Sequence, residues 1–191
     1  MYQQFRDTGR DIFTAGLISS HGGNISVREG DDIVITRRGS MLGRLGESDL
    51  VHTNVAACAA DEHCSRELVV HRAIYNACDA SAIAHAHGVH TVYRSLVGDS
   101  IVPIDSESRY VIGASIPVLA PSETIGSAEA AEMLARAFAD GARVAVLRTH
   151  GPFAIGATLD EAFYHLTCLE ASCRLLDLRD SIGLPLVSQN G

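Results

Sequence analysis

The sequence lacks several features that mark whole classes of protein. No apolar run is long enough to cross a bilayer, so we expect no membrane partner. The first residues, M-Y-Q-Q-F-R-D, contain no basic stretch followed by a hydrophobic one, so we expect no signal peptide and a cytoplasmic protein. There is no basic cluster, and the formal net charge is −8, which argues against a nucleic-acid partner.

Cysteine is present without a pairing pattern. None of the five cysteines forms a C-x-x-C pair. An odd number without a secretory signal indicates reduced thiols in a cytoplasmic protein. No internal repeat or linker interrupts the 191 residues, and 47% of them are hydrophobic. We therefore expect a single domain, residues 1–191, with a substantial core.

Apolar periodicity and turn residues predict alternating strands and helices. The expected helices cover residues 3–18, 65–78, 91–96, 127–141 and 158–181. The expected strands cover residues 25–28, 33–36, 81–87, 116–119, 142–150 and 152–156, with a short strand and turn region in 49–62 and a strand and loop in 101–113. This alternation predicts a three-layer α/β domain, and the early hairpin excludes an all-parallel sheet.

Histidine is the unusual feature of the composition, with nine residues. His85 and His87 belong to the segment S-A-I-A-H-A-H-G-V-H, which reads as a short strand that ends near Gly88. Residues two apart on a strand share a face, so the two imidazoles would lie side by side and could bind a divalent metal, most often zinc. The alternative is one buried, hydrogen-bonded histidine and one exposed histidine.

Two further residues could join such a metal site. His150 follows a buried strand and would supply a third nitrogen, an arrangement typical of catalytic zinc with an open position. Glu67 could be a fourth ligand or a base, although a carboxylate in the first turn of a helix capped by Ser65 is also favoured by the helix dipole. His71, one turn later, is better explained as a structural hydrogen-bonding group.

Two polar loops could bind an anion. The first is the turn with Gly22, Gly23 and Asn24, and the second is T-R-R-G-S, which contains Arg38 and Gly39. Backbone N–H groups and an arginine at such loops can hold a phosphate. A pair of ordinary solvated loops is the simpler interpretation when these residues are considered alone.

The order of these motifs along the chain is more informative than any one of them alone. The series G-G-N-I-S-V-R, I-T-R-R-G, S-R-E-x-x-x-H, H-A-H-G-V-H and R-T-H-G resembles the class II aldolase/adducin family, and in particular its aldolases of L-fuculose 1-phosphate. The resemblance covers nearly the whole chain. It implies a three-layer α/β/α fold with a central mixed, largely antiparallel sheet.

The resemblance also implies roles for individual residues. His85, His87 and His150 match the zinc ligands, with one Zn²⁺ per subunit, and Glu67 matches the carboxylate that completes the coordination and then acts as acid and base. The residues that match the phosphate-binding loops are Gly23, Asn24, Gly39 and Ser65. The implied reaction is cleavage of a ketose 1-phosphate to dihydroxyacetone phosphate and an aldehyde, with zinc as the Lewis acid. The family further implies a homotetramer with active sites at subunit interfaces.

This sequence departs from the family pattern at several points. Arg66 replaces a serine of the usual S-S-E, and Arg38 replaces a threonine, so both changes keep or add affinity for an anion. The tyrosine acid that a neighbouring subunit supplies has no clear match; Ser106 or Glu107 aligns there, with Tyr110 nearby.

Other activities of the same family remain open. They are a pentulose-5-phosphate 4-epimerase, a methylthioribulose-phosphate dehydratase and a non-catalytic adducin-like module. Glu67 favours the aldolase, because the epimerase branch usually has aspartate at this position. The complete set of three histidines and one glutamate argues against the non-catalytic module.

Overall fold

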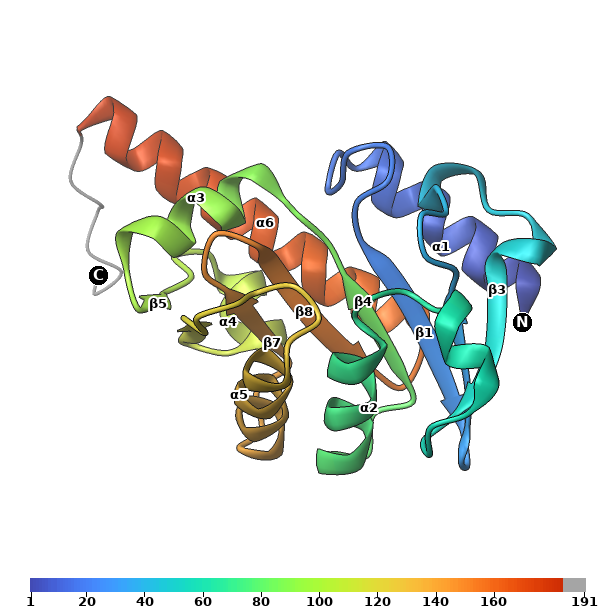
Figure 1. Ribbon diagram of the computed structural model, residues 1–191. Coiled ribbons are helices and arrows are strands. Elements are labelled where there is room, and N and C mark those ends of the chain that lie inside the picture. The colour runs from blue at the N-terminus through green and yellow to red at the C-terminus, as the bar shows by residue number, and fades with distance from the viewer. Residues whose placement is uncertain (184–191) are drawn as a thin grey trace.

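The computed structural model describes residues 1–183, which are built around one eight-stranded sheet (Figure 1). The strand order is β3-β2-β1-β4-β8-β7-β6-β5. The strands are β1 (Asn24–Glu29), β2 (Asp32–Thr36), β3 (Leu50–Asn54), β4 (Ala82–His85), β5 (Ser100–Ile101), β6 (Ile116–Leu119), β7 (Val144–Leu147) and β8 (Gly151–Gly156). Strands β6 and β7 are parallel, and all other neighbouring pairs are antiparallel. The expected mixed, largely antiparallel sheet is therefore confirmed.

Helices cover both faces of the sheet (Figure 1). The helices are α1 (Tyr2–Thr14), α2 (Leu68–Ala77), α3 (Val89–Val97), α4 (Ser106–Ile112), α5 (Ala128–Ala139) and α6 (Leu159–Ile182), with short 3₁₀ turns at Leu42–Arg44, Glu47–Asp49 and Ala59–His63. Helices α2 and α5 pack together on one face, whereas α1, α3 and α4 pack against α6 on the other. This confirms the predicted three-layer α/β/α architecture. None of the helices described combines the length and apolar character needed to cross a membrane.

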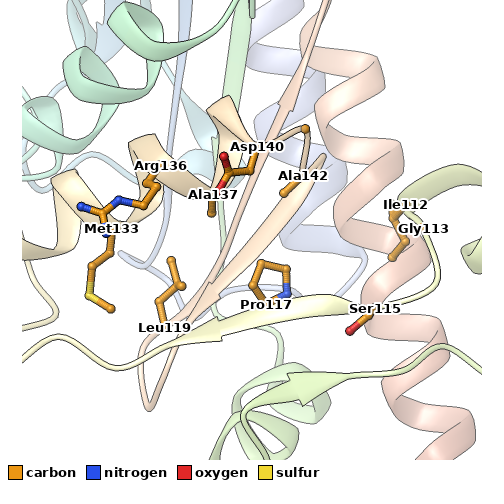
Figure 2. Close-up of a pocket in the computed structure, with 11 residues that line it drawn as sticks. Ile112, Gly113, Ser115, Pro117, Leu119, Met133, Arg136, Ala137, Asp140 and Ala142 are labelled. Carbon is orange, nitrogen blue, oxygen red and sulfur yellow. The ribbon is translucent and has the colours of Figure 1, made fainter.

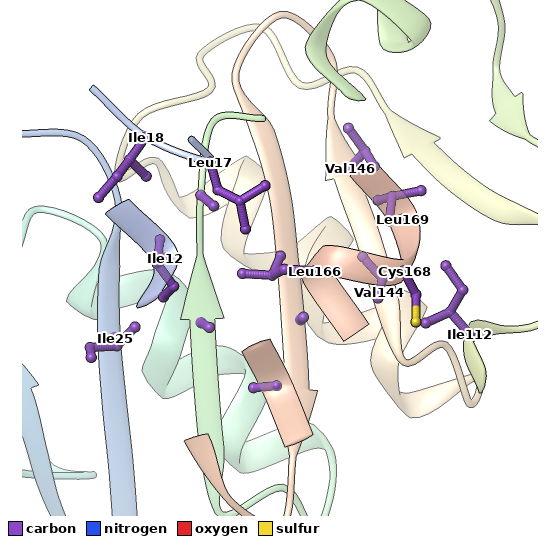
Figure 3. Packing of buried hydrophobic residues seen from close by; sticks show 14 of the residues in the cluster. Ile12, Leu17, Ile18, Ile25, Ile112, Val144, Val146, Leu166, Cys168 and Leu169 are labelled. Carbon is purple, nitrogen blue, oxygen red and sulfur yellow. The ribbon is translucent and has the colours of Figure 1, made fainter. Parts of the chain in front are cut away.

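Alternation along the strands divides the interior into two cores. In β7, Val144 and Val146 join the core under α6, while Ala145 and Leu147 join the core under α2 and α5. Figure 3 shows the first core, where side chains of α1, α6 and the sheet interdigitate. Since successive strand residues point to opposite faces, a sheet buried on both sides needs apolar residues at nearly every position.

Several helix boundaries differ from those predicted. The helix expected from residue 65 begins at Leu68, with Glu67 at the capping position. The backbone N–H of Ser65 donates to Thr36 O at 3.1 Å, and Arg37 pairs with Cys64 as an isolated β-bridge. This pairing keeps the chain extended up to residue 65, so the helix starts later. The first helix likewise ends at Thr14 rather than near residue 18.

The prediction for residues 101–113 was wrong in its second part. Strand β5 contains two residues, and the polar stretch after it forms helix α4. The Asp105 side chain caps this helix by accepting the Ser108 N–H at 2.8 Å. Asp105 as the N-cap and Glu107 in the first turn both favour the start of a helix here, although the apolar residues of this segment are isolated. The helices expected from residues 127 and 158 begin there, with Ser127 and Thr158 as their N-caps.

Candidate active site

Three histidine side chains converge at one end of the central strands. His85 is the last residue of β4, and its Nε2 atom lies 2.9 Å from Nε2 of His87 and 2.9 Å from Nε2 of His150. His87 lies just beyond β4 rather than on it, and His150 lies in the turn after β7. These three residues form a cluster whose ligand atoms all lie within 4.8 Å of one another.

The hydrogen bonding of His85 makes this cluster suited to a cation. The Nδ1–H of His85 donates to the backbone oxygen of Pro152 at 2.9 Å, so its Nε2 atom carries a single lone pair. One lone pair cannot accept well from both neighbouring rings. A divalent cation accepts all three lone pairs, and Zn–N bonds of about 2.0–2.1 Å bring tetrahedral ligand nitrogens to about 3.3 Å from one another. The donor set therefore fits zinc.

Electrostatics favour neutral histidines here, as metal binding requires. Burial lowers the pKa of His85 well below its ordinary value, and the neighbouring His87 and His150 lower it further. Burial also lowers the pKa of His87, and it lowers the pKa of His150 to about 4, with a smaller effect from His87. The ring of His85 stacks on Phe153 at a centroid distance of 4.0 Å, which fixes its plane.

Glu67 lies against the histidine cluster at the start of α2. Its Oε1 atom is 3.6 Å from Nε2 of His150, and the residue is 3% exposed. Burial raises the pKa of Glu67 to about 7, and the backbone N–H of Gly126, 3.2 Å from both carboxylate oxygens, opposes this shift. Glu67 therefore titrates near neutral pH, where it can both accept and donate a proton.

The backbone around His150 is held in an unusual conformation. Thr149 has a φ of 67°, the one positive value for a non-glycine residue among those described. Its N–H donates to the Ser95 hydroxyl at 3.1 Å. At Gly151, a Cβ atom would lie 2.2 Å from the backbone oxygen of Ala86, so only glycine fits beside the segment between His85 and His87. This tight turn aims His150 at His85, and strain of this kind is often found at functional sites.

A cavity of about 290 Å³ opens over the histidines. It brings together the ten residues predicted for the metal and phosphate sites: Gly23, Asn24, Arg38, Gly39, Ser65, Arg66, Glu67, His85, His87 and His150. Its wall also includes residues that sequence reasoning missed as site residues, among them His21, Arg37 and Ile125. Gly126, the partner of Glu67, was missed as well. Its loop carries no motif, and only its proximity to Glu67 in three dimensions identifies it.

The cavity has a basic side and a constrained backbone. Arg38 and Arg66 are exposed, and no side-chain hydrogen bond or ion pair engages either one within residues 1–183, whereas Arg37 Nε donates to Ser48 O at 2.9 Å. Gly23 has a φ of 74°, and a Cβ there would lie 2.6 Å from His85 O. Glycine thus lets this loop lie directly against the end of β4, which carries His85.

Other predicted residues lie elsewhere. His71 is fully buried and hydrogen-bonds Ser26 and Asn24, as expected of a structural group. Glu107 and Tyr110 lie on α4, outside the cavity of their own chain. Tyr110 is 88% exposed, and the Glu107 carboxylate accepts from the Tyr164 hydroxyl at 2.9 Å.

A larger cavity of about 570 Å³ lies between α5 and β6 (Figure 2). Its lining is mostly apolar, with Pro117 and Leu119 on the strand and Met133 and Ala137 on the helix. No histidine, cysteine or glutamate is among the described residues that line it. Size alone therefore does not identify the chemically equipped site, which is the smaller cavity over His85.

The fold and the smaller cavity together define a class: an α/β/α protein with a three-histidine, one-glutamate cluster beside basic loops. The chain matches the family model of the class II aldolase and adducin N-terminal domain over residues 3–176, and it belongs to that family. It is similar to the crystal structure of an L-fuculose-1-phosphate aldolase from Thermus thermophilus, with 36% identity, 98% of each chain covered and a TM-score of 0.90.

Curated relatives agree with this assignment. The L-fuculose phosphate aldolase of Methanocaldococcus jannaschii is 29% identical over 174 residues, which are 91% of this chain and 93% of the relative. The enzyme of the same name from Escherichia coli K12 is 32% identical over 164 residues, which are 85% of this chain and 75% of the relative.

Proposed function

We propose that this protein is a zinc-dependent class II aldolase, a lyase that cleaves a ketose 1-phosphate. The substrate would resemble L-fuculose 1-phosphate, and the products would be dihydroxyacetone phosphate and an aldehyde such as lactaldehyde. The observation that carries the proposal is the approach of three histidine Nε2 atoms and the Glu67 carboxylate within one cavity. Two similar proteins named for L-fuculose phosphate, from M. jannaschii and T. thermophilus, support the substrate class.

In this proposal His85, His87 and His150 hold the metal, and Glu67 completes its coordination before substrate binds. Bound there, Zn²⁺ would act as a Lewis acid toward the substrate carbonyl. Glu67 would hold or release a proton at the substrate carbon that becomes nucleophilic, a role that carboxyl groups perform in general acid–base catalysis. The Gly126 N–H would keep the carboxylate oriented while it exchanges this proton.

The substrate phosphate would bind on the basic side of the cavity. The proposed contacts are with Gly23, Asn24, Arg38, Gly39, Ser65 and Arg66. Exposed guanidinium groups that have no side-chain partner within residues 1–183 are free to pair with a phosphate, and such pairs are directional when bidentate.

The assembly is part of the same proposal. A homotetramer would place Glu107 or Tyr110 of a neighbouring subunit near the open side of the metal, which is consistent with the high exposure of Tyr110. Such a contact would exclude water from the site. The net charge of −8 argues against nucleic acid as a partner. It is consistent with a small anionic sugar that binds at a local basic site. A cytoplasmic location completes the proposal.

A substrate panel tests the proposed reaction. Metal-loaded protein is incubated with L-fuculose 1-phosphate, simpler ketose 1-phosphates, a pentulose 5-phosphate and methylthioribulose phosphate. Release of dihydroxyacetone phosphate is coupled to NADH oxidation, and consumption of the last two substrates is followed separately. We expect turnover with at least one ketose 1-phosphate and none with the H85A variant. Conversion of a pentulose 5-phosphate or of methylthioribulose phosphate, without dihydroxyacetone phosphate from any substrate, would identify one of the other family reactions. No turnover of any substrate by metal-loaded protein would favour a non-catalytic module.

A further inference from the structure

A buried chain of hydrogen bonds leads from the core to the cavity. The Tyr75 hydroxyl lies 2.7 Å from Ser26 Oγ, Ser26 Oγ lies 2.6 Å from His71 Nδ1, and His71 Nε2 lies 2.6 Å from Asn24 Oδ1. The first three residues are at most 1% exposed, and Asn24 is 5% exposed and lines the cavity. None of the first three was assigned a part in the reaction above.

The direction of this chain is fixed at its buried end. Within residues 1–183, Ser26 Oγ is the hydrogen-bond partner of the Tyr75 hydroxyl, so Tyr75 donates its single proton there. If Tyr75 accepted instead, its own O–H would be left unpaired in the core, at a cost of about 1–3 kcal/mol. The Ser26 proton is consequently donated to His71 Nδ1.

The same direction continues to the cavity. His71 is fully buried and each of its two ring nitrogens has one hydrogen-bond partner, so the direction fixed at Nδ1 also fixes Nε2. Because Nδ1 accepts from Ser26, the ring proton is on Nε2 and is donated to Asn24 Oδ1. The amide oxygen of Asn24 is thereby occupied, and its NH₂ group, which has no acceptor among the described residues, keeps two donors at a residue that lines the cavity.

We propose that Tyr75, Ser26 and His71 are positioning residues that hold the Asn24 amide with its NH₂ group toward the cavity, so that this wall binds an oxyanion. That the oxyanion is the phosphate of a ketose 1-phosphate rests on the proposed function. Reversal of the chain would turn the amide oxygen toward the cavity, where it would repel an anion. Arg38 and Arg66 line the same cavity and add positive charge.

The tautomer of His71 tests the proposal directly. In ¹⁵N-histidine-labelled protein, nitrogen chemical shifts distinguish a protonated Nε2 from a protonated Nδ1. We expect the His71 proton on Nε2 in the wild type. In Tyr75→Phe the fixed donor is lost, both directions become possible, and we expect a mixture of tautomers. Tyr93→Phe is the matched control, because that side chain is exposed and its hydroxyl makes no hydrogen bond within residues 1–183.

Binding of inorganic phosphate to the metal-loaded protein provides the second readout. We expect Tyr75→Phe and Ser26→Ala to raise the dissociation constant about three- to tenfold, the effect of one weakened hydrogen bond, and Tyr93→Phe to leave it unchanged. If the protein is an aldolase, KM should rise by the same factor while kcat changes less than about twofold.

Three results would overturn the proposal. The first is a wild-type His71 with its proton on Nδ1. The second is phosphate affinity within about twofold of wild type in both variants. The third is an equal loss in Tyr93→Phe. Neither readout requires aldol cleavage, so this proposal is tested independently of the proposed reaction. If a variant does not fold, the wild-type tautomer still decides the direction of the chain.

Discussion

The Oε1 atom of Glu67 lies 3.6 Å from Nε2 of His150, although Glu67 is the residue before helix α2 and His150 follows strand β7. Burial acts on the two groups in opposite directions. It raises the pKa of Glu67 to about 7 and lowers the pKa of His150 to about 4. In the metal-free protein these opposite shifts favour a proton on the carboxyl group beside a neutral imidazole. A divalent cation would displace this proton, so that metal uptake releases protons.

Glu67→Gln separates metal binding from proton transfer. The amide keeps the shape of the side chain but cannot accept a proton, so we expect the variant to retain metal and lose about 10²–10⁴-fold in kcat for cleavage. Metal content and steady-state rates check this. Glu132→Gln, in an exposed ion pair on α5, is the control and should behave as wild type. Nearly full cleavage by Glu67→Gln would exclude Glu67 as the acid–base group.

Arg38→Ala and Arg66→Ala test the proposed anion site. Loss of a guanidinium that pairs with phosphate should raise KM for a phosphorylated substrate about tenfold in at least one variant, because charged hydrogen bonds contribute about 1.5–3 kcal/mol. Arg136→Ala removes an exposed arginine of α5 and should leave KM unchanged. Unchanged KM in both test variants would show that neither arginine binds the substrate.

The ion pair between Asp61 and Arg72 predicts a pH dependence of stability. Both Arg72 terminal nitrogens contact the carboxylate, at 2.7 and 2.8 Å, and this pairing holds the pKa of Asp61 well below its usual range. A depressed folded pKa means that the unfolded chain binds more protons. The contribution is therefore complete above about pH 4 and is lost as pH falls below it.

Asp61→Asn should consequently lower the free energy of unfolding by about 1.5–3 kcal/mol at pH 7 and by much less at pH 2. Urea unfolding at both pH values measures the difference. Glu62→Gln, at a neighbouring and largely exposed position, should have little effect at either pH. An equal loss for Asp61→Asn at pH 7 and pH 2 would mean that packing, not charge, explains it.

Tyr110→Phe and Glu107→Gln test whether a neighbouring subunit supplies the general acid. If the site is shared in a homotetramer, one of these variants should lower kcat by about 10²-fold or more while the three histidines still bind metal. Light scattering of the wild type should show a tetramer. A fully active, stable monomer would exclude a shared site.

Much of the fold could be predicted because its signals are local. The starts of α5 and α6 at the caps Ser127 and Thr158 and the continuous apolar run of β7 each reflect interactions within a few residues, and the structure has both helices and the buried strand. The late start of α2 could not be predicted, because it depends on pairing of Cys64 with Arg37 on a distant segment. Helix α4 was missed although its signal is local, since the Asp105 cap was not weighed.

The candidate site shows the same division. His85, His87, His150 and Glu67 could be chosen from motif and family resemblance, and the structure brings them into one cavity. Two features could not be predicted from the sequence. They are the contact of Gly126 with Glu67 and the direction of the Tyr75–Ser26–His71 hydrogen-bond chain, and each depends on segments that meet only in the folded protein. Sequence identified the reactive groups but not the residues that orient them.

Metal reconstitution tests the central claim most directly. Protein stripped with a chelator is titrated with Zn²⁺, and bound metal and cleavage of L-fuculose 1-phosphate are followed in the same samples. We expect activity to be absent without metal, to rise in proportion to bound zinc and to reach its plateau at one equivalent per chain. His85→Ala should neither bind zinc at this site nor gain activity. Full cleavage by the stripped protein, or tight zinc binding that survives loss of His85, would contradict it.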